Sequence, residues 1–231
     1  MRFAALLAAL ITAMAAGDFF DDFESYSTGD DPGDSPDWSR EPTGGYVLVA
    51  DDGGDQVIES YFPDSAFTGY LCDGAGFWDD GNVSMEFSVT GSGVMVNVFS
   101  RMQLMTGEAY VGGLIFWMQP LTFVYIAHVS VTGDYEILLQ TAGPSMPAGT
   151  WADVRLEAAG TDPVTLTLYC KDQLAGQVED SVYVLGPGLS GFAFIYDDQV
   201  PTILADDFQV TETPQALLQG TFGAVKASFS P

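Results

Sequence analysis

The sequence has little positive charge. Its 231 residues include six Lys and Arg against 32 Asp and Glu, a formal net charge of −26. A field of that sign repels nucleic acids and anionic membrane surfaces, and it attracts multivalent cations. We therefore expect no nucleic-acid partner, and we interpret the excess of acids first as a means of staying soluble in an extracellular or salty medium.

Long apolar runs are also absent, since no stretch reaches the roughly 18 uninterrupted apolar residues that a membrane-spanning helix needs. The chain begins with Met1-Arg2, continues with an Ala- and Leu-rich run, and reaches the small-x-small sequence Ala13-Met14-Ala15. This order is typical of a signal peptide, which we assign to residues 1–17. We expect a secreted or cell-envelope protein without a membrane span.

Histidine is nearly missing, which limits the catalytic sites that the chain can build. His128 is the only histidine, so a histidine-dependent triad or a zinc site would have to use it. Neither G-x-S-x-G nor H-E-x-x-H occurs. We interpret His128 as structural first and as a ligand contact second. Arg101, at the end of VMVNVFSR, is interpreted first as the partner of one of the many acids.

Cysteine is scarce as well. Cys72 and Cys170 each end a strand-like run, GYLC and LTLYC. The compartment of an exported chain permits a disulfide, so we predict a Cys72–Cys170 bridge, with two buried free thiols as the alternative. No CxxC or Cys/His spacing indicates a metal site.

What the chain does have is strand signals at short intervals, with no convincing amphipathic helix before the last residues. Turn sequences such as DDGGD (51–55) and GTDP (160–163) separate them. About a dozen short strands indicate an all-β fold of two packed antiparallel sheets, a jelly-roll sandwich, over residues 18–211. The predicted strands are residues 46–50, 56–61, 82–89, 94–101, 109–118, 121–131, 135–140, 151–158, 164–170, 174–180, 189–196 and 203–211.

Residues 212–231 differ from this pattern and are assigned to a linker and a C-terminal tail. Phe222, Val225 and Phe229 have the spacing of one face of a short helix. We expect a surface helix or a flexible tail, with an attachment or sorting role as the alternative. The ending TFGAVKASFSP is similar to short endings of exported bacterial proteins, which supports a bacterial source.

Seven segments occur in a recognisable order: DDFES, FWDDGNVSMEFSV, VMVNVFSR, GTWADVRLEAAG, VTLTLYCKDQLAGQ, GLSGFAFIYDD and LADDFQV. Together they resemble the concanavalin A-like lectin/glucanase superfamily, particularly its laminin-G-like and keto-disaccharide-hydrolase-like secreted domains. The resemblance covers residues 18–211 and implies a jelly-roll fold. It leaves function open, because the superfamily includes lectins, hydrolases, adhesion modules and spacers.

The resemblance also implies one structural calcium ion where the first and last strands meet. The matching residues are Glu24 in DFES and Asp206 or Asp207 in ADDFQV, with Asp22 as a further ligand and a backbone carbonyl from residues 43–45. Calcium takes oxygen ligands, and acids from distant strands repel one another unless a cation lies between them. Strand alternation places Asp206 inward beside Phe208, so we prefer it to Asp207. The alternative is that these acids are solvated.

A glucanase of this superfamily needs the paired acids of E-x-D-x-x-E on one strand, and no Glu here has Asp two residues later. We therefore favour a non-catalytic module that binds glycan or serves in adhesion, which needs aromatic faces and a few polar groups. The alternatives are a sugar hydrolase and a purely structural surface protein. The candidate ligand residues, provided that they lie on an exposed concave sheet, are Trp117, Tyr110, Tyr125, Trp78, His128 and Arg101. Core packing is the first interpretation of the four aromatic residues, and ligand binding is the second.

Overall fold

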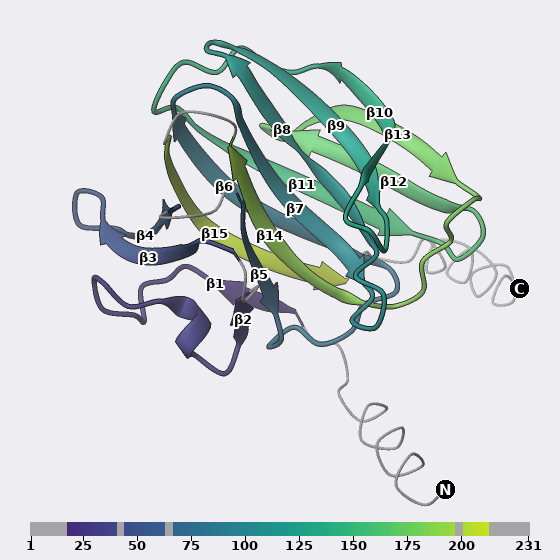
Figure 1. The fold of residues 1–231 in the computed structure, drawn as a ribbon, viewed down its shortest axis with the longest axis horizontal. Coiled ribbons are helices and arrows are strands. Elements are labelled where there is room, and N and C mark those ends of the chain that lie inside the picture. Colours follow the sequence, from purple (N-terminus) through teal and green to yellow (C-terminus); the bar gives the residue numbers. More distant parts are fainter. Residues whose placement is uncertain (1–17, 41–43, 63–66, 197–200, 213–231) are drawn as a thin grey trace, which may run out of the picture.

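The computed structural model describes residues 18–40, 44–62, 67–196 and 201–212. The expected signal peptide, residue 43 of the predicted carbonyl ligands 43–45, and the tail from residue 213 lie outside these ranges. Within them the chain forms fifteen strands and one short 3-10 turn, η1 (Pro32–Asp34), arranged as two stacked sheets (Figure 1). No helix of the described part is long and apolar enough to cross a bilayer.

The eight-stranded sheet has the order β13-β12-β11-β6-β15-β4-β3, and β1 pairs with β15 outside this path. All its pairings are antiparallel. Its strands are β1 (Phe19–Asp21), β3 (Tyr46–Asp51), β4 (Gln56–Tyr61), β6 (Gly81–Thr90), β11 (Trp151–Ala159), β12 (Val164–Cys170), β13 (Gln173–Asp180) and β15 (Thr202–Glu212).

The seven-stranded sheet has the order β10-β9-β8-β7-β14-β5-β2 and is antiparallel too. Its strands are β2 (Trp38–Arg40), β5 (Phe67–Cys72), β7 (Val94–Met102), β8 (Ala109–Met118), β9 (Leu121–Val129), β10 (Tyr135–Ala142) and β14 (Leu189–Tyr196). The predicted all-β jelly-roll sandwich is confirmed. Each of the twelve predicted strands is present, and β1, β2 and β5 add to them.

The main core lies between the two sheets and follows from strand alternation. In β11, buried and half-exposed residues alternate along the whole strand. Val154 and Leu156 enter the core, whereas Asp153 and Arg155 lie on the outer face of the sheet. The core is close to continuous apolar packing across both inner faces, and it holds large rings such as Phe87, which meets Phe194 edge to face.

The opening segment lies against the final strand, as the calcium prediction required. Phe19 pairs with Val210 and Asp21 with Phe208, in antiparallel register. The buried Asp21 carboxylate accepts hydrogen bonds from the Phe23 amide, the Tyr26 hydroxyl and the Trp38 indole, at 2.9, 3.0 and 2.8 Å. Asp21, which the sequence reasoning did not single out, is therefore the acid that fixes the N-terminal segment to the sandwich.

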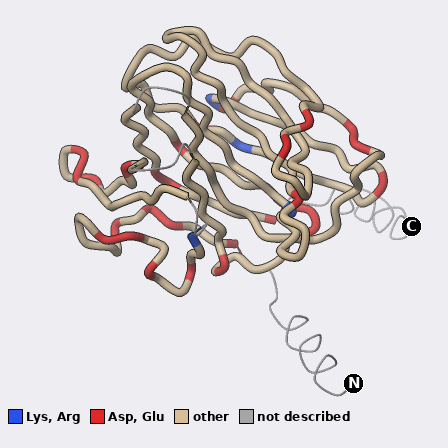
Figure 2. The backbone as a smooth tube through the Cα atoms, viewed as in Figure 1, with Lys and Arg blue, Asp and Glu red and all other residues tan. Residues whose placement is uncertain are grey.

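Acids are unevenly distributed over this fold. Figure 2 shows them gathered in the N-terminal loops and in the turns at the strand ends, while the long strands carry few. A hollow lies on each of the two outer faces of the sandwich, and the two differ in chemistry.

Candidate functional site

The outer face of the seven-stranded sheet is apolar. In β7 and β8, Val98 and Tyr110 point into the core, so the residues next to each of them in the strand point outward. They form a second hydrophobic cluster of Phe99, Ala109, Val111, Tyr125, Ala127 and Ala193. Both faces of this sheet are therefore apolar, and the strands β7, β8, β9 and β14 read as nearly continuous apolar runs.

A cleft of about 790 Å³ lies on this outer face. Rings of Phe67, Phe99 and Tyr135 line it, and small residues such as Gly69 and Ala193 leave the space between them. The loops after β7 and after β9 contribute polar and apolar groups to the lining: Gln103, Leu104, Ser130, Val131 and Thr132, with Arg40 from β2. None of the described residues that line the cleft is Asp or Glu, although the chain is strongly acidic.

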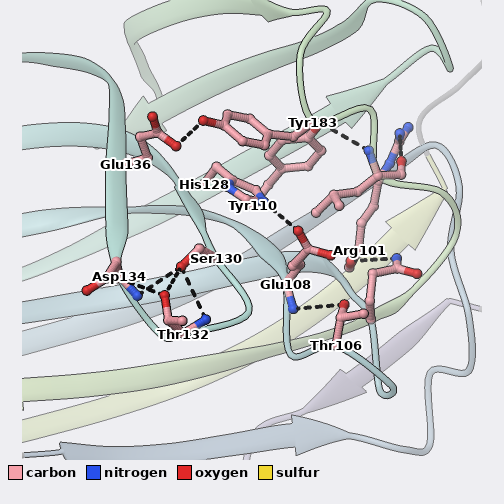
Figure 3. Close-up of polar contacts among 12 residues, drawn as sticks. Arg101, Thr106, Glu108, Tyr110, His128, Ser130, Thr132, Asp134, Glu136 and Tyr183 are labelled. Carbon is pink, nitrogen blue, oxygen red and sulfur yellow. Dashed lines mark hydrogen bonds and ion pairs between the residues drawn. The ribbon is translucent and has the colours of Figure 1, made fainter.

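Both loops beside the cleft are held by their own hydrogen bonds (Figure 3). In the first, the Gln103 side chain donates to the carbonyls of Arg101 and Gly186, each at 2.9 Å. In the second, the Ser130 hydroxyl accepts from the Asp134 amide at 3.2 Å, and Thr132 donates to the Asp134 carboxylate at 2.7 Å. Contacts within the protein therefore fix the two loops beside the cleft.

Arg101 lies behind this cleft and not on its surface. Its guanidinium is fully buried and donates to the carbonyls of Leu185 and Gly160 at 2.8 and 2.7 Å and to the Asp80 carboxylate at 3.2 Å. Its backbone is left-handed, with φ of 55°. The interpretation of Arg101 as the partner of an acid is confirmed, and its buried side chain offers nothing to a ligand.

His128 and Tyr110 are buried next to Arg101 (Figure 3). The imidazole stacks on the Tyr183 ring at 3.7 Å between centroids, and its Nε2 lies 3.6 Å from a Glu108 carboxylate oxygen. The Tyr110 hydroxyl donates to Asp180 at 2.8 Å, and burial raises its pKa. These side chains join β8, β9 and the loop after β13, and they present no face to a sugar.

Among the other aromatic candidates, only Trp117 meets the condition of exposure. It is 69% exposed at the β8–β9 hairpin, whereas Tyr125 is fully buried and Trp78 is 4% exposed. Tyr125 donates to Asn97 across Gly113, where a Cβ would collide with Asn97, and the Trp78 indole donates to the Ala75 carbonyl at 3.0 Å. Tyr110, Tyr125 and Trp78 therefore fail the condition of exposure and pack in the interior instead.

Asp206, the preferred ligand of the predicted calcium ion, lies next to a bulge in β15. The register of β15 shifts between Asp206 and Gln209, and Asp207 takes φ of 50°, which is a bulge. Ile203 and Ala205 consequently point into the core. Asp206 points to the outer face of the sheet, as Leu204 does. The prediction that Asp206 points inward is wrong, because one extra residue reverses the alternation before Phe208.

Asp206 nevertheless has little contact with water, being 9% exposed. Burial raises its pKa to about 7, the amide of Asp207 lowers it, and the carboxylates of Asp207, Asp55 and Asp22 raise it further. Acids from β15, the β3–β4 turn and the segment after β1 therefore lie within electrostatic reach of one another, as the predicted closure requires.

The ligand set itself does not fit a metal ion as it stands. The Glu24 carboxylate accepts from the Gln56 amide at 2.7 Å, and Asp22 accepts from the Glu24 amide at 3.2 Å. Across the described ranges, no three His, Cys, Asp or Glu residues are placed so that they could hold a metal ion. Calcium stays a prediction, to be tested on Asp206.

The two cysteines are free and buried in different sheets, Cys72 in β5 and Cys170 in β12. The predicted disulfide is therefore wrong, and the alternative of two buried thiols holds. Burial raises the pKa of Cys72 to about 12 and that of Cys170 to about 11, so neither is a reactive thiolate near neutral pH.

No protein-family model and no curated protein sequence matches the chain. Solved structures do. The carbohydrate binding module CBM66 from Bacillus subtilis is 14% identical, with a TM-score of 0.54 over 77% of this chain and 96% of its own. The beta-glucanase of Bacillus licheniformis is 10% identical, with a TM-score of 0.58 over 87% and 100%.

A protein of unknown function with a galectin-like fold, also from Bacillus subtilis, is 15% identical, with a TM-score of 0.57 over 81% of this chain and 98% of its own. At these identities the likeness shows the fold alone. The chain has the concanavalin A-like jelly-roll fold, as the order of its sequence segments implied.

Proposed function

We propose that the chain is an exported, non-catalytic module that binds glycan in the cleft on the outer face of its seven-stranded sheet. The fold supports this, because it is shared with a carbohydrate binding module and with glucanases. The observation that carries the proposal is the cleft itself: a largely apolar hollow whose described lining contains no carboxylate, in a chain with a net charge of −26.

The lining suits a neutral sugar. Sugar rings present apolar C–H faces, which pack on aromatic side chains, and hydroxyls at their edges, which need a few well-placed polar partners. Phe67 and Tyr135 supply the rings, and Gln103, Ser130 and Thr132 supply polar groups at the rim. The volume of about 790 Å³ lies within the usual range for small-molecule sites.

The absence of acids from the lining supports a binding role over the runner-up, a sugar hydrolase. Hydrolysis of a glycosidic bond commonly uses two carboxyl groups about 5–9 Å apart across the scissile bond. The described residues of the cleft provide none. A hydrolase would need to place its substrate elsewhere on the molecule or to bring in acids from other residues.

The test is a glycan array, followed by calorimetric titration of the strongest binder and a reducing-sugar assay on the same compound. Leu104 lines the cleft and is 58% exposed, so Leu104→Asp puts a charge at the mouth without disturbing the core. Met105, 96% exposed on the same loop, does not line the cleft, and Met105→Asp is the matched control.

We expect Leu104→Asp to weaken binding at least about tenfold, or about 1.4 kcal/mol, with little change for Met105→Asp. Trp117→Ala separates the cleft from the hairpin, since Trp117 lies about 20 Å further along β8 than Val111. If Trp117→Ala lost binding and Leu104→Asp did not, the binding site would lie at the β8–β9 hairpin and not in the cleft. An array without binders, or release of reducing sugar, would overturn the proposal.

A further inference from the structure

The outer face of the eight-stranded sheet carries a row of acids. In the strand register, Glu86 on β6 lies opposite Asp206 on β15 and opposite Asp153 on β11. Asp207, in the bulge of β15, lies beside these acids. Asp172 follows β12, and its amide lies 3.4 Å from the Asp153 carboxylate. Like charges on directly opposed residues of neighbouring strands destabilise a sheet.

Four of these acids, Glu86, Asp153, Asp172 and Asp207, line a trough of about 340 Å³ in which positive charge is scarce. Its described lining includes one cation, Arg155, whose guanidinium lies over the Tyr169 ring at 4.2 Å and 3.6 Å from Glu157. Burial, followed by the nearby Asp207, Asp153 and Asp172, raises the pKa of Glu86. The charge of the trough is thus not balanced by the described residues.

The trough also includes the exposed ring of Phe20, and it lies beside the last residues that the structure describes. Phe20, opposite Gln209 in the register, lines it and is 56% exposed. Thr211 lines it too, and the last strand ends one residue later at Glu212. The chain therefore leaves the sandwich at one end of the trough.

The segment that follows is complementary to this surface. Residues 213–231 contain no Asp or Glu, although acids are frequent in the rest of the chain. They include Lys226, one of two lysines in the whole sequence, and the apolar residues Phe222, Val225 and Phe229.

We propose that residues 213–231 fold back onto this outer face of their own chain, with Lys226 among Glu86, Asp153, Asp172 and Asp207 and an apolar side chain against Phe20. From Glu212 to Asp207 the strand covers about 17 Å. As a helix, the tail carries Lys226 about 20 Å from its start, and an extended tail reaches further. Residues 213–231 are thus long enough to reach the acids of the trough, start at its end, and carry a positive charge opposite to that of the acids.

The test is zero-length carbodiimide cross-linking of the full chain without its signal peptide, with peptide mass spectrometry. Lys171 and Lys226 are the only lysines, so every amide bond to a lysine can be assigned. We expect bonds within one molecule from Lys226 to the acids of the trough. At about 1 M salt, where the screening length is about 3 Å, their yield should fall at least about fivefold.

Three outcomes would overturn the proposal: no bond to Lys226, bonds spread over acids far from the trough such as Asp51 and Asp134, or bonds found only between two molecules. As a second measurement, NMR titration should show the pKa of Glu86 rising by about half a unit in Lys226→Glu, which replaces attraction by repulsion, and holding in Lys226→Arg. Equal values in both variants would contradict the proposal. Glycan binding takes place on the other sheet, so its failure and this one are separate results.

Discussion

The two outer faces of the sandwich are built by the same rule and have opposite chemistry. On the seven-stranded sheet the outward residues are apolar, and the cleft between them contains no described acid. On the eight-stranded sheet most of the described residues that line the trough are polar, and four of them are acids. Strand alternation makes both faces, so the difference lies in which residue types occupy the outward positions.

The largest difference should appear between removing the buried Arg101 and removing the half-exposed Arg155. Arg101→Met leaves the Asp80 carboxylate and the carbonyls of Leu185 and Gly160 without a buried donor. We expect a loss of about 3–5 kcal/mol of unfolding free energy. Arg155→Met removes a half-exposed ion pair and should cost about 1 kcal/mol or less. Urea unfolding measures both, and similar losses would show that Arg101 is no more than a surface cation.

A second effect concerns Asp206, whose pKa is raised to about 7 from 3.8. The folded state then binds the proton more tightly than the unfolded state, so stability falls as pH rises between about 4 and 7. A shift of about three units corresponds to at most about 4 kcal/mol. Asp206→Asn should flatten this slope and be the more stable protein at pH 8. A wild-type slope equal to that of the variant would contradict the burial of Asp206.

The same carboxyl tests the calcium prediction. A bound cation would replace the proton, so millimolar calcium should raise the thermal midpoint of the wild type above pH 7 by mass action, and chelator should lower it. Sodium at equal ionic strength is the control, and Asp206→Asn should respond less. An equal change of the thermal midpoint in calcium and in sodium would contradict the calcium prediction.

A smaller effect would show how dry each face is. Val111 is 3% exposed on the apolar face, and Val111→Thr exchanges a methyl for a hydroxyl of nearly the same volume. We expect a cost of about 1–3 kcal/mol from burying that hydroxyl without a partner. Ser84→Thr on the polar face should change stability by about 0.5 kcal/mol or less. Equal costs, measured by urea unfolding, would mean that the cleft is as wet as the trough.

The smallest effect is expected from reductant. Each sheet contains one buried thiol, and a bridge between them would contribute about 2–5 kcal/mol. Because Cys72 and Cys170 are free, reductant should leave the thermal midpoint unchanged, and alkylating reagents should label both thiols only after unfolding. A lower thermal midpoint in reductant would instead indicate a disulfide between Cys72 and Cys170.

The strands themselves were predictable, because alternation is a local property of the sequence. Twelve strands, including β11 with its regular pattern, follow from runs of apolar residues between turn sequences. β2 has only three residues and β5 contains Gly69, so neither gives a strong pattern. The side-by-side position of β1 and β15 came from the resemblance to a known superfamily and not from the residues alone.

The sequence by itself determined the all-β class, the strand positions and the excess of acids, because each depends on neighbouring residues or on composition. Only the tertiary structure decided which face a residue occupies once a bulge intervenes, as at Asp206, and which aromatic rings stay exposed, as at Trp117. It also decided that Arg101 and His128 lie beneath a loop and that a cleft lies above β8. The physical reason is that burial of an outer face depends on loops and strands distant in the sequence, and alternation says nothing about them.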